Sequence, residues 1–144
     1  MRSSRANRKP GTNIGSSALL SLVALLSLPI YASTQMVSGR DLWILLALAS
    51  MISVFAFFAY RGDKRRAEAG EWRVPESTLH ILSLLGGWPG AFMAQRVYRH
   101  KTSKASFQFV FWCVVLFHQF IAIDSVLDWR FTSDAFQLLK QQIA

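Results

Sequence analysis

Cysteine and acidic residues are scarce in this chain of 144 residues. Its one cysteine, Cys113, excludes an intrachain disulfide and a metal site built from thiolates, and we expect it to be a small buried apolar residue. Eight acidic residues face sixteen Lys and Arg, for a net charge of +8, yet 52% of the residues are hydrophobic. These numbers exclude a secreted disulfide scaffold, a disordered basic tail protein and most soluble enzymes.

Charge is also absent from four apolar windows of 17 to 19 residues each. A helix of about 20 apolar residues crosses a bilayer core about 30 Å thick. The sequence therefore predicts an all-α, multi-pass helical membrane protein. The windows are residues 16–32, 42–60, 78–95 and 107–123.

The first window also has the features of a signal peptide, because basic residues precede it and Ile30-Tyr31-Ala32 resembles a cleavage site. Pro29 and the bulky Tyr31 suit the end of a transmembrane helix instead. We favour a span, and cleavage of residues 1–32 stays open as the alternative.

The third window is broken at its centre by the run Leu85-Gly86-Gly87-Trp88-Pro89-Gly90. Glycine and proline there remove helix propensity and a backbone donor. We expect two half-helices, 76–85 and 90–98, that enter the membrane and return, for three spans plus a re-entrant segment. The alternative is four spans.

The positive-inside rule favours the re-entrant arrangement. It places thirteen of the sixteen Lys and Arg on the cytosolic side with the N-terminus, whereas a crossing third window would place eleven there. We therefore predict residues 1–15 as a disordered cytosolic tail, 16–123 as the membrane domain and 124–144 as an amphipathic interfacial segment.

A basic stretch follows the third window and precedes a predicted helix. Its cations lie near free backbone amides that Thr102, Ser103 or Ser106 would cap, an arrangement that attracts anions such as phosphate. The alternative is a set of cations that only fixes topology and touches anionic lipid. The anion-binding candidates are Arg96, Arg99, His100, Lys101, Thr102 and Lys104.

Further polar residues could support such a site. We interpret 63–76 as a solvated loop in which Asp63 or Glu68 pairs with a nearby cation, and Pro75-Glu76 as the start of a helix. His118 is expected to hydrogen-bond to backbone freed at Gly86 to Gly90. The supporting candidates are Asp63, Lys64, Pro75, Glu76, His80, Gly86, Gly87, Pro89, Gly90 and His118.

The strings PExxLHxxxLLGGWPG, from Pro75, and RHKTxKxxF, from Arg99, resemble the DUF1294 family of bacterial membrane proteins of unknown function, together with Asp63-Lys64, Ala67, Gly70 and Arg73. The resemblance implies the bacterial cytoplasmic (inner) membrane and no defined activity. Members of the family often carry a cold-shock nucleic-acid-binding domain. Residues 1–15 are too short for one, which puts an RNA or DNA role in doubt.

The leading hypothesis is therefore a membrane protein that binds a phosphate-bearing ligand at a basic cytosolic face, with membrane lipids as partners. The ligand could be a lipid headgroup, a nucleotide or nucleic acid. One alternative is a small enzyme acting on a lipid or lipid-linked phosphate, using Asp63, Glu76, His80 and His100. Another is a partner subunit of a membrane complex. The sequence predicts no metal site, and cofactors and the oligomeric state stay unknown.

Overall fold

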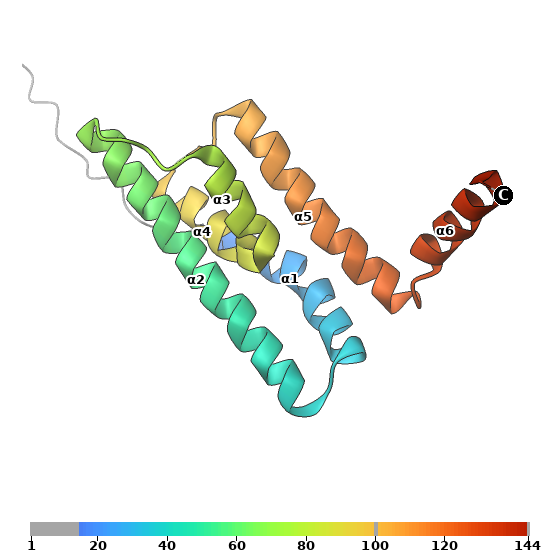
Figure 1. Ribbon diagram of the computed structural model, residues 1–144. Coiled ribbons are helices and arrows are strands. Elements are labelled where there is room, and N and C mark those ends of the chain that lie inside the picture. Colours follow the sequence, from blue (N-terminus) through green and yellow to red (C-terminus); the bar gives the residue numbers. More distant parts are fainter. Residues whose placement is uncertain (1–14, 100, 144) are drawn as a thin grey trace, which may run out of the picture.

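The structure is a computed structural model that describes residues 15–99 and 101–143. Within these ranges every regular element is helical, as predicted (Figure 1). Apart from Gly15, the predicted tail lies outside the described residues. The elements are α1 (Ser16–Met36), α2 (Gly39–Ala69), α3 (Glu76–Leu82), the π-helical turn η1 (Ser83–Gly87), α4 (Trp88–Tyr98), α5 (Ala105–Val126) and α6 (Arg130–Ile143).

Three helices, α1, α2 and α5, are long and apolar enough to cross a membrane. They contain the first, second and fourth predicted windows. Their outward faces carry large hydrophobic side chains, among them Trp43 and Phe109, both 72% exposed. Cys113 lies on the exposed surface of α5, so the expectation that it is buried was wrong.

Helix α2 is longer than the sequence suggested. It continues through the charged residues after Tyr60 to Ala69, and the next residue, Gly70, caps it in the left-handed conformation (φ 71°) typical of a helix C-terminus. The interpretation of 63–76 as a loop was therefore wrong for residues 63–69. Only the segment between Ala69 and Glu76 is irregular.

The third window folds as a helical hairpin, and the predicted break is confirmed. The chain turns at Gly86, which has a φ of 103° that L side chains rarely adopt. Helix α3 leads into this turn and α4 leads back out toward the same end of the molecule (Figure 1). The second arm begins at Trp88 rather than at Gly90, with Pro89 in its first turn.

The turn of the hairpin packs directly on the backbone of α2. A Cβ atom at Gly90 would lie 1.7 Å from the Ser53 carbonyl oxygen, and one at Gly87 would lie 2.9 Å from the Ala56 Cβ. Ser53 donates a hydrogen bond to the Gly86 carbonyl oxygen at 3.3 Å. Small residues thus bring the two backbones together where a larger side chain would separate them.

The hydrophobic core lies in the half of the bundle that the hairpin fills. Tyr60, Leu79, Phe92, Phe107 and Phe111 are all 1% exposed or less, and they come from α2, α3, α4 and α5. On the other side of the bundle α1 packs on α5, and the Gln119 side chain donates a hydrogen bond to the Leu25 carbonyl oxygen at 2.7 Å.

Helix α6 stands apart from the bundle beyond the end of α5 (Figure 1). The buried Asp124 carboxylate accepts hydrogen bonds from the backbone amides of Phe131 (2.9 Å) and Thr132 (3.2 Å), which lie in the first turn of α6. No residue of α6 is buried. A helix thus exists where the sequence predicted one, and its interfacial location stays a prediction.

Candidate functional site at the charged end of the hairpin

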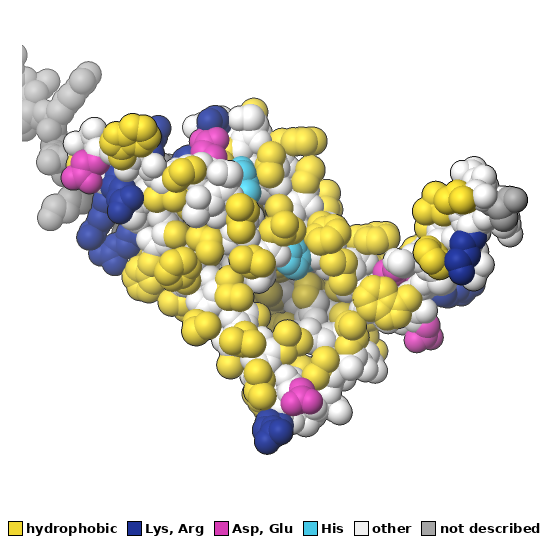
Figure 2. Space-filling model, in the orientation of Figure 1, with side chains coloured by type: hydrophobic (Ala, Val, Ile, Leu, Met, Phe, Trp, Pro, Cys, Tyr) yellow, Lys and Arg dark blue, Asp and Glu magenta, His cyan; other side chains and the backbone are white. Residues whose placement is uncertain are grey.

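The described cations gather where the two arms of the hairpin begin and end. Nine of the twelve lie there, with four carboxylates. Arg40 lies at the opposite end of α2, and Arg130 and Lys140 lie in α6. The dark blue side chains crowd one end of the molecule in Figure 2. The nine are Arg61, Lys64, Arg65, Arg66, Arg73, Arg96, Arg99, Lys101 and Lys104.

Glu76, the first residue of α3, joins the two ends of the hairpin. Its carboxylate lies 2.8 Å from the ammonium group of Lys101 and 2.8 Å from that of Lys104. Hydrogen bonds from these two lysines lower the pKa of Glu76 from 4.5 to about 2. The carboxylate is therefore ionised at neutral pH.

Asp63 lies beneath this pair with no exposed surface, contrary to the solvated loop that we expected. One carboxylate oxygen is 3.4 Å from the Lys101 ammonium, and the other accepts a hydrogen bond from the Val74 backbone amide at 3.1 Å. The next residue, Lys64, donates to the Tyr98 carbonyl oxygen at 2.8 Å and lies 3.6 Å from Glu68. Asp63 and Lys64 thus fix the connecting segment and the end of α4 to α2.

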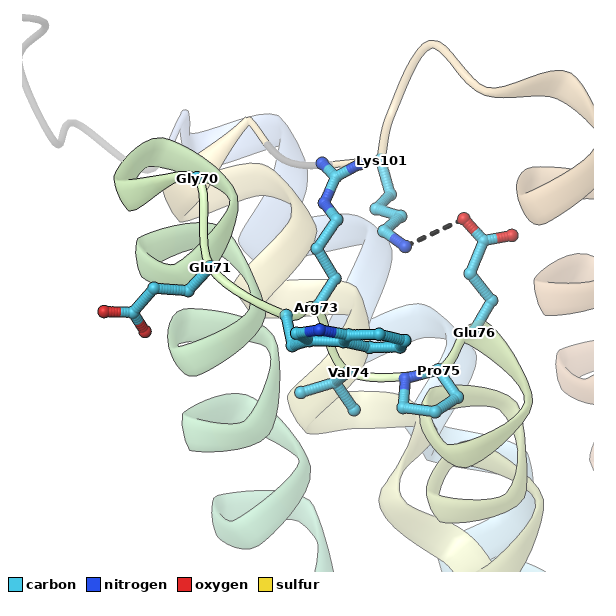
Figure 3. A pocket seen from close by; sticks show the side chains of 8 residues that line it. Gly70, Glu71, Arg73, Val74, Pro75, Glu76 and Lys101 are labelled. Carbon is cyan, nitrogen blue, oxygen red and sulfur yellow. Dashed lines mark hydrogen bonds and ion pairs between the residues drawn. The ribbon is translucent and has the colours of Figure 1, made fainter.

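A pocket of about 570 Å³ lies beside these ion pairs, lined by residues 70–76 and Lys101. In Figure 3 the Arg73 side chain extends toward Lys101, the Lys101 ammonium faces the Glu76 carboxylate, and the Glu71 carboxylate points away. Arg73 and Lys101 therefore line one pocket, and Lys101 is paired with Glu76 and Asp63 there. Sequence reasoning missed Arg73 because its approach to Lys101 depends on how the segment after Gly70 turns back.

The remaining anion-binding candidates do not converge in the same way. Arg96 places its guanidinium 3.7 Å from the centre of the Phe92 ring. Arg99, in the left-handed region (φ 46°), and Thr102 are exposed. His100 lies outside the described residues.

The predicted cap of α5 was wrong. Lys104 occupies the N-cap position, and no side chain makes a capping hydrogen bond there. Two glutamines that we had not singled out do stabilise this corner: Gln108 donates to the buried Gln95 side chain at 2.6 Å and to the Lys101 carbonyl oxygen at 2.9 Å.

The two membrane-window histidines have separate environments. His80 lies one turn after Glu76 and stacks on Phe107, with ring centres 4.3 Å apart. His118 hydrogen-bonds through Nδ1 to the Val114 carbonyl oxygen of its own helix at 2.8 Å. The expected bond from His118 to the hairpin backbone was therefore wrong, and Ser53 satisfies the Gly86 carbonyl instead.

The carboxylates of this arrangement are poorly suited to proton transfer at neutral pH. Asp63, Glu76 and His80 lie near Lys101, but the lysine pairs with both carboxylates, and a carboxylate with a pKa of about 2 is a weak general base at neutral pH. Among residues 15–99 and 101–143, no three His, Cys, Asp or Glu side chains lie close enough to hold a metal ion.

The fold and site define a small all-helical protein with three helices fit to span a membrane and a helical hairpin closed by ion pairs. The family described as "Protein of unknown function (DUF1294)" matches residues 53–107. The "Uncharacterized protein YsdA" of Bacillus subtilis (strain 168) is 32% identical over 66 residues, which cover 46% of this chain and 74% of that protein. The chain belongs to the DUF1294 family. No solved structure matches it.

The matched region coincides with the hairpin and its supports. It begins at Ser53, which contacts the turn, and ends at Phe107, which packs on His80 and Tyr60. The charged end of the hairpin, from Asp63 to Lys104, lies within it.

Proposed function

We propose that this chain is an integral protein of a bacterial cytoplasmic membrane, with its N-terminus in the cytosol, and that its hairpin re-enters the membrane from the cytosolic side. The carrying observation is the charge distribution. Nine described cations surround the open end of the hairpin, and three lie elsewhere. The cytosolic side of a membrane protein carries the excess of Lys and Arg.

The cationic end binds the phosphate of an anionic lipid headgroup in the pocket between residues 70–76 and Lys101. Lys101 already pairs with Asp63 and Glu76, so Arg73 supplies the guanidinium that a phosphate contacts through two parallel hydrogen bonds. Lys101 lies at the wall of the same pocket, where its ion pairs with Asp63 and Glu76 hold it in place.

A lipid headgroup fits better than a free nucleotide because of Trp72, which also lines the pocket and is 94% exposed. Tryptophan prefers the headgroup region, where its ring is partly in hydrocarbon and its N–H meets water. An exposed Trp72 next to Arg73 therefore supports a pocket that lies at the membrane surface. Binding, rather than the enzyme or partner-subunit alternatives, is the function that these contacts support.

The test is thermal unfolding of the purified full chain in neutral detergent with added lipid. Phosphatidylglycerol should raise Tm more than phosphatidylcholine does. Arg73→Ala should lose at least half of this difference, whereas Arg40→Ala, an equal change in charge at the other end of α2, should keep it. Raising salt from about 0.1 M to about 1 M shortens the Debye length from about 10 Å to about 3 Å and should reduce the difference.

Glycerol 3-phosphate and ATP serve as soluble phosphate probes in the same assay. A larger rise in Tm with either one than with phosphatidylglycerol would contradict a lipid as the source of the phosphate. Equal losses in the Arg73→Ala and Arg40→Ala variants would show that only net charge matters and would refute the pocket.

A further inference from the structure

A second cavity, here called the apolar chamber, lies at the tip of the hairpin, away from the charged pocket. Its volume is about 480 Å³. The walls come from Leu26 and Ile30 of α1 and from Leu46 and Ala49 of α2, while Trp88 and His118 close its inner side. Figure 2 shows a hollow between walls of hydrophobic side chains near the middle of the molecule.

The chamber exists because the hairpin reaches only part of the way along the bundle. Helix α1 packs mainly on α5, and α2 packs mainly on the hairpin. Helices α1 and α2 therefore lie apart, and they meet at the turn between Met36 and Gly39. Beyond Gly86 the hairpin has ended and cannot fill the space between them. The space beyond the hairpin tip is therefore left as a cavity.

Three polar side chains of the lining make hydrogen bonds within the protein. Ser33 donates to the Pro29 carbonyl oxygen at 2.8 Å, Ser53 donates to that of Gly86 at 3.3 Å, and the His118 Nδ1 contacts that of Val114 at 2.8 Å. A mostly apolar cavity in which these three polar groups already have partners has little affinity for water and accommodates hydrocarbon.

We propose that the apolar chamber binds one hydrocarbon chain of a membrane lipid, an inference that rests on the membrane location proposed above. The outward faces of α1 and α2 are apolar, so the ligand can enter sideways from the bilayer. A helix about 10 Å wide fills roughly 400 Å³ per turn, so the chamber would hold about one turn of a partner helix. A flexible chain fits this volume, whereas a helix crossing half the bilayer does not.

Trp88 provides a reporter inside the chamber, because it lines the cavity and is 3% exposed overall. The full chain, with its other four tryptophans changed to Phe, is reconstituted into vesicles of phosphatidylcholine that carries bromine on its acyl chains. Bromine quenches tryptophan fluorescence on contact. Ala49→Phe fills the chamber, and Ala47→Phe places the same ring on an exposed position of α2 outside the lining.

Quenching of Trp88 should fall at least twofold in Ala49→Phe and stay unchanged in Ala47→Phe. Equal quenching of Trp88 in both variants, or no quenching in the parent chain, would contradict the binding of a hydrocarbon chain in the apolar chamber. A stable dimer that shields Trp88 from bromine would overturn it too and would assign the chamber to a second copy.

Two controls keep the result interpretable. The first control is flotation of the protein with the vesicles. Protein that does not float with them contradicts the membrane location and with it the lipid ligand. Protein that floats but shows no quenching of Trp88 refutes the chamber ligand alone. If Ala49→Phe does not fold, the parent chain is crosslinked to a lipid with a diazirine in its acyl chain. Crosslinks at Ala49, Ser53, Trp88 or Pro89 support the proposal, and crosslinks confined to the outward faces refute it.

Discussion

At the scale of single residues, Gly90 and Gly62 have opposite environments. A Cβ on Gly90 would overlap the Ser53 backbone, while a Cβ on Gly62, in helix α2, would meet nothing within 4 Å. Glycine to alanine at position 90 therefore tests the close approach of the hairpin to α2. The same change at position 62 tests only the ordinary preference of a helix for alanine.

Gly90→Ala should destabilise the protein by about 1 to 3 kcal/mol, because the hairpin must move away from α2 to admit the methyl group. Gly62→Ala should be neutral or stabilising by up to about 1 kcal/mol, since alanine is the better helix former. Thermal unfolding in detergent measures both. Equal stability of the two variants would contradict the backbone contact between α2 and the hairpin.

The ion pairs of Glu76 predict a pH dependence of stability. Its folded pKa of about 2 lies below the unfolded value of 4.5, so its contribution is fully present above about pH 4.5 and is lost as the pH falls toward about 2. The contribution should be small, about 1 kcal/mol or less, because the lysine partner Lys104 is half-exposed.

The measurement is Tm at pH 6 and pH 3 for the parent chain, Glu76→Gln and Glu68→Gln. The drop in Tm on acidification should be smaller in Glu76→Gln than in the parent chain. Glu68, which makes one pair at 3.6 Å and is largely exposed, provides the control and should leave the drop unchanged. An identical drop in all three proteins would contradict a stabilising role for Glu76.

At the scale of elements, the end of α5 and the start of α6 depend on one carboxylate. Asp124→Ala would leave the amides of Phe131 and Thr132 without their acceptor. The loss of such an N-terminal acceptor costs about 0.5 to 2 kcal/mol, and α6 has no buried residue to offset it. Limited proteolysis should therefore cut residues 127–134 faster in Asp124→Ala than in Asp134→Ala. Equal rates would mean that α6 is held by other contacts.

The helices were predictable because their signals are local. Absence of charge over 17 to 19 residues identified the cores of α1, α2 and α5, and the glycines and proline identified the break in the third window. The extension of α2 to Ala69 was missed because its last turns are charged, a pattern that a solvated loop shares. Helix propensity alone could not distinguish the two.

The candidate site was less predictable, because it depends on contacts distant in sequence. Lys101 was identified from its basic neighbourhood, but its partners Asp63 and Glu76 are 38 and 25 residues away. The number of charges along the sequence identifies a basic face. It does not show which of its cations form ion pairs with carboxylates in the folded protein. The approach of Arg73 to Lys101 likewise requires the fold of residues 70–76.

At the scale of the whole molecule, the proposed topology places Ser103 and Ser38 on opposite sides of the membrane. Both are exposed, and they lie at opposite ends of the spanning helices. In a Cys113→Ser background, an impermeant thiol reagent added to intact cells should label Ser38→Cys and leave Ser103→Cys unlabelled until the membrane is opened. Labelling of Ser103→Cys in intact cells would contradict the cytosolic location of the charged end and with it the proposed orientation.

The ion pairs between Glu76 and the two lysines keep both ends of the hairpin together, which affects how the chain inserts into a membrane. Under the proposed topology the hairpin enters and leaves on one side, so the nine cations around its open end never have to pass through hydrocarbon. The described polar parts that must be translocated are the short turn near Arg40 and the C-terminal helix α6. Because Gly90 seats on the backbone of α2, that helix must be in place before the hairpin can close. Insertion of the hairpin is then a step that follows the placement of α2 and translocates no polar segment.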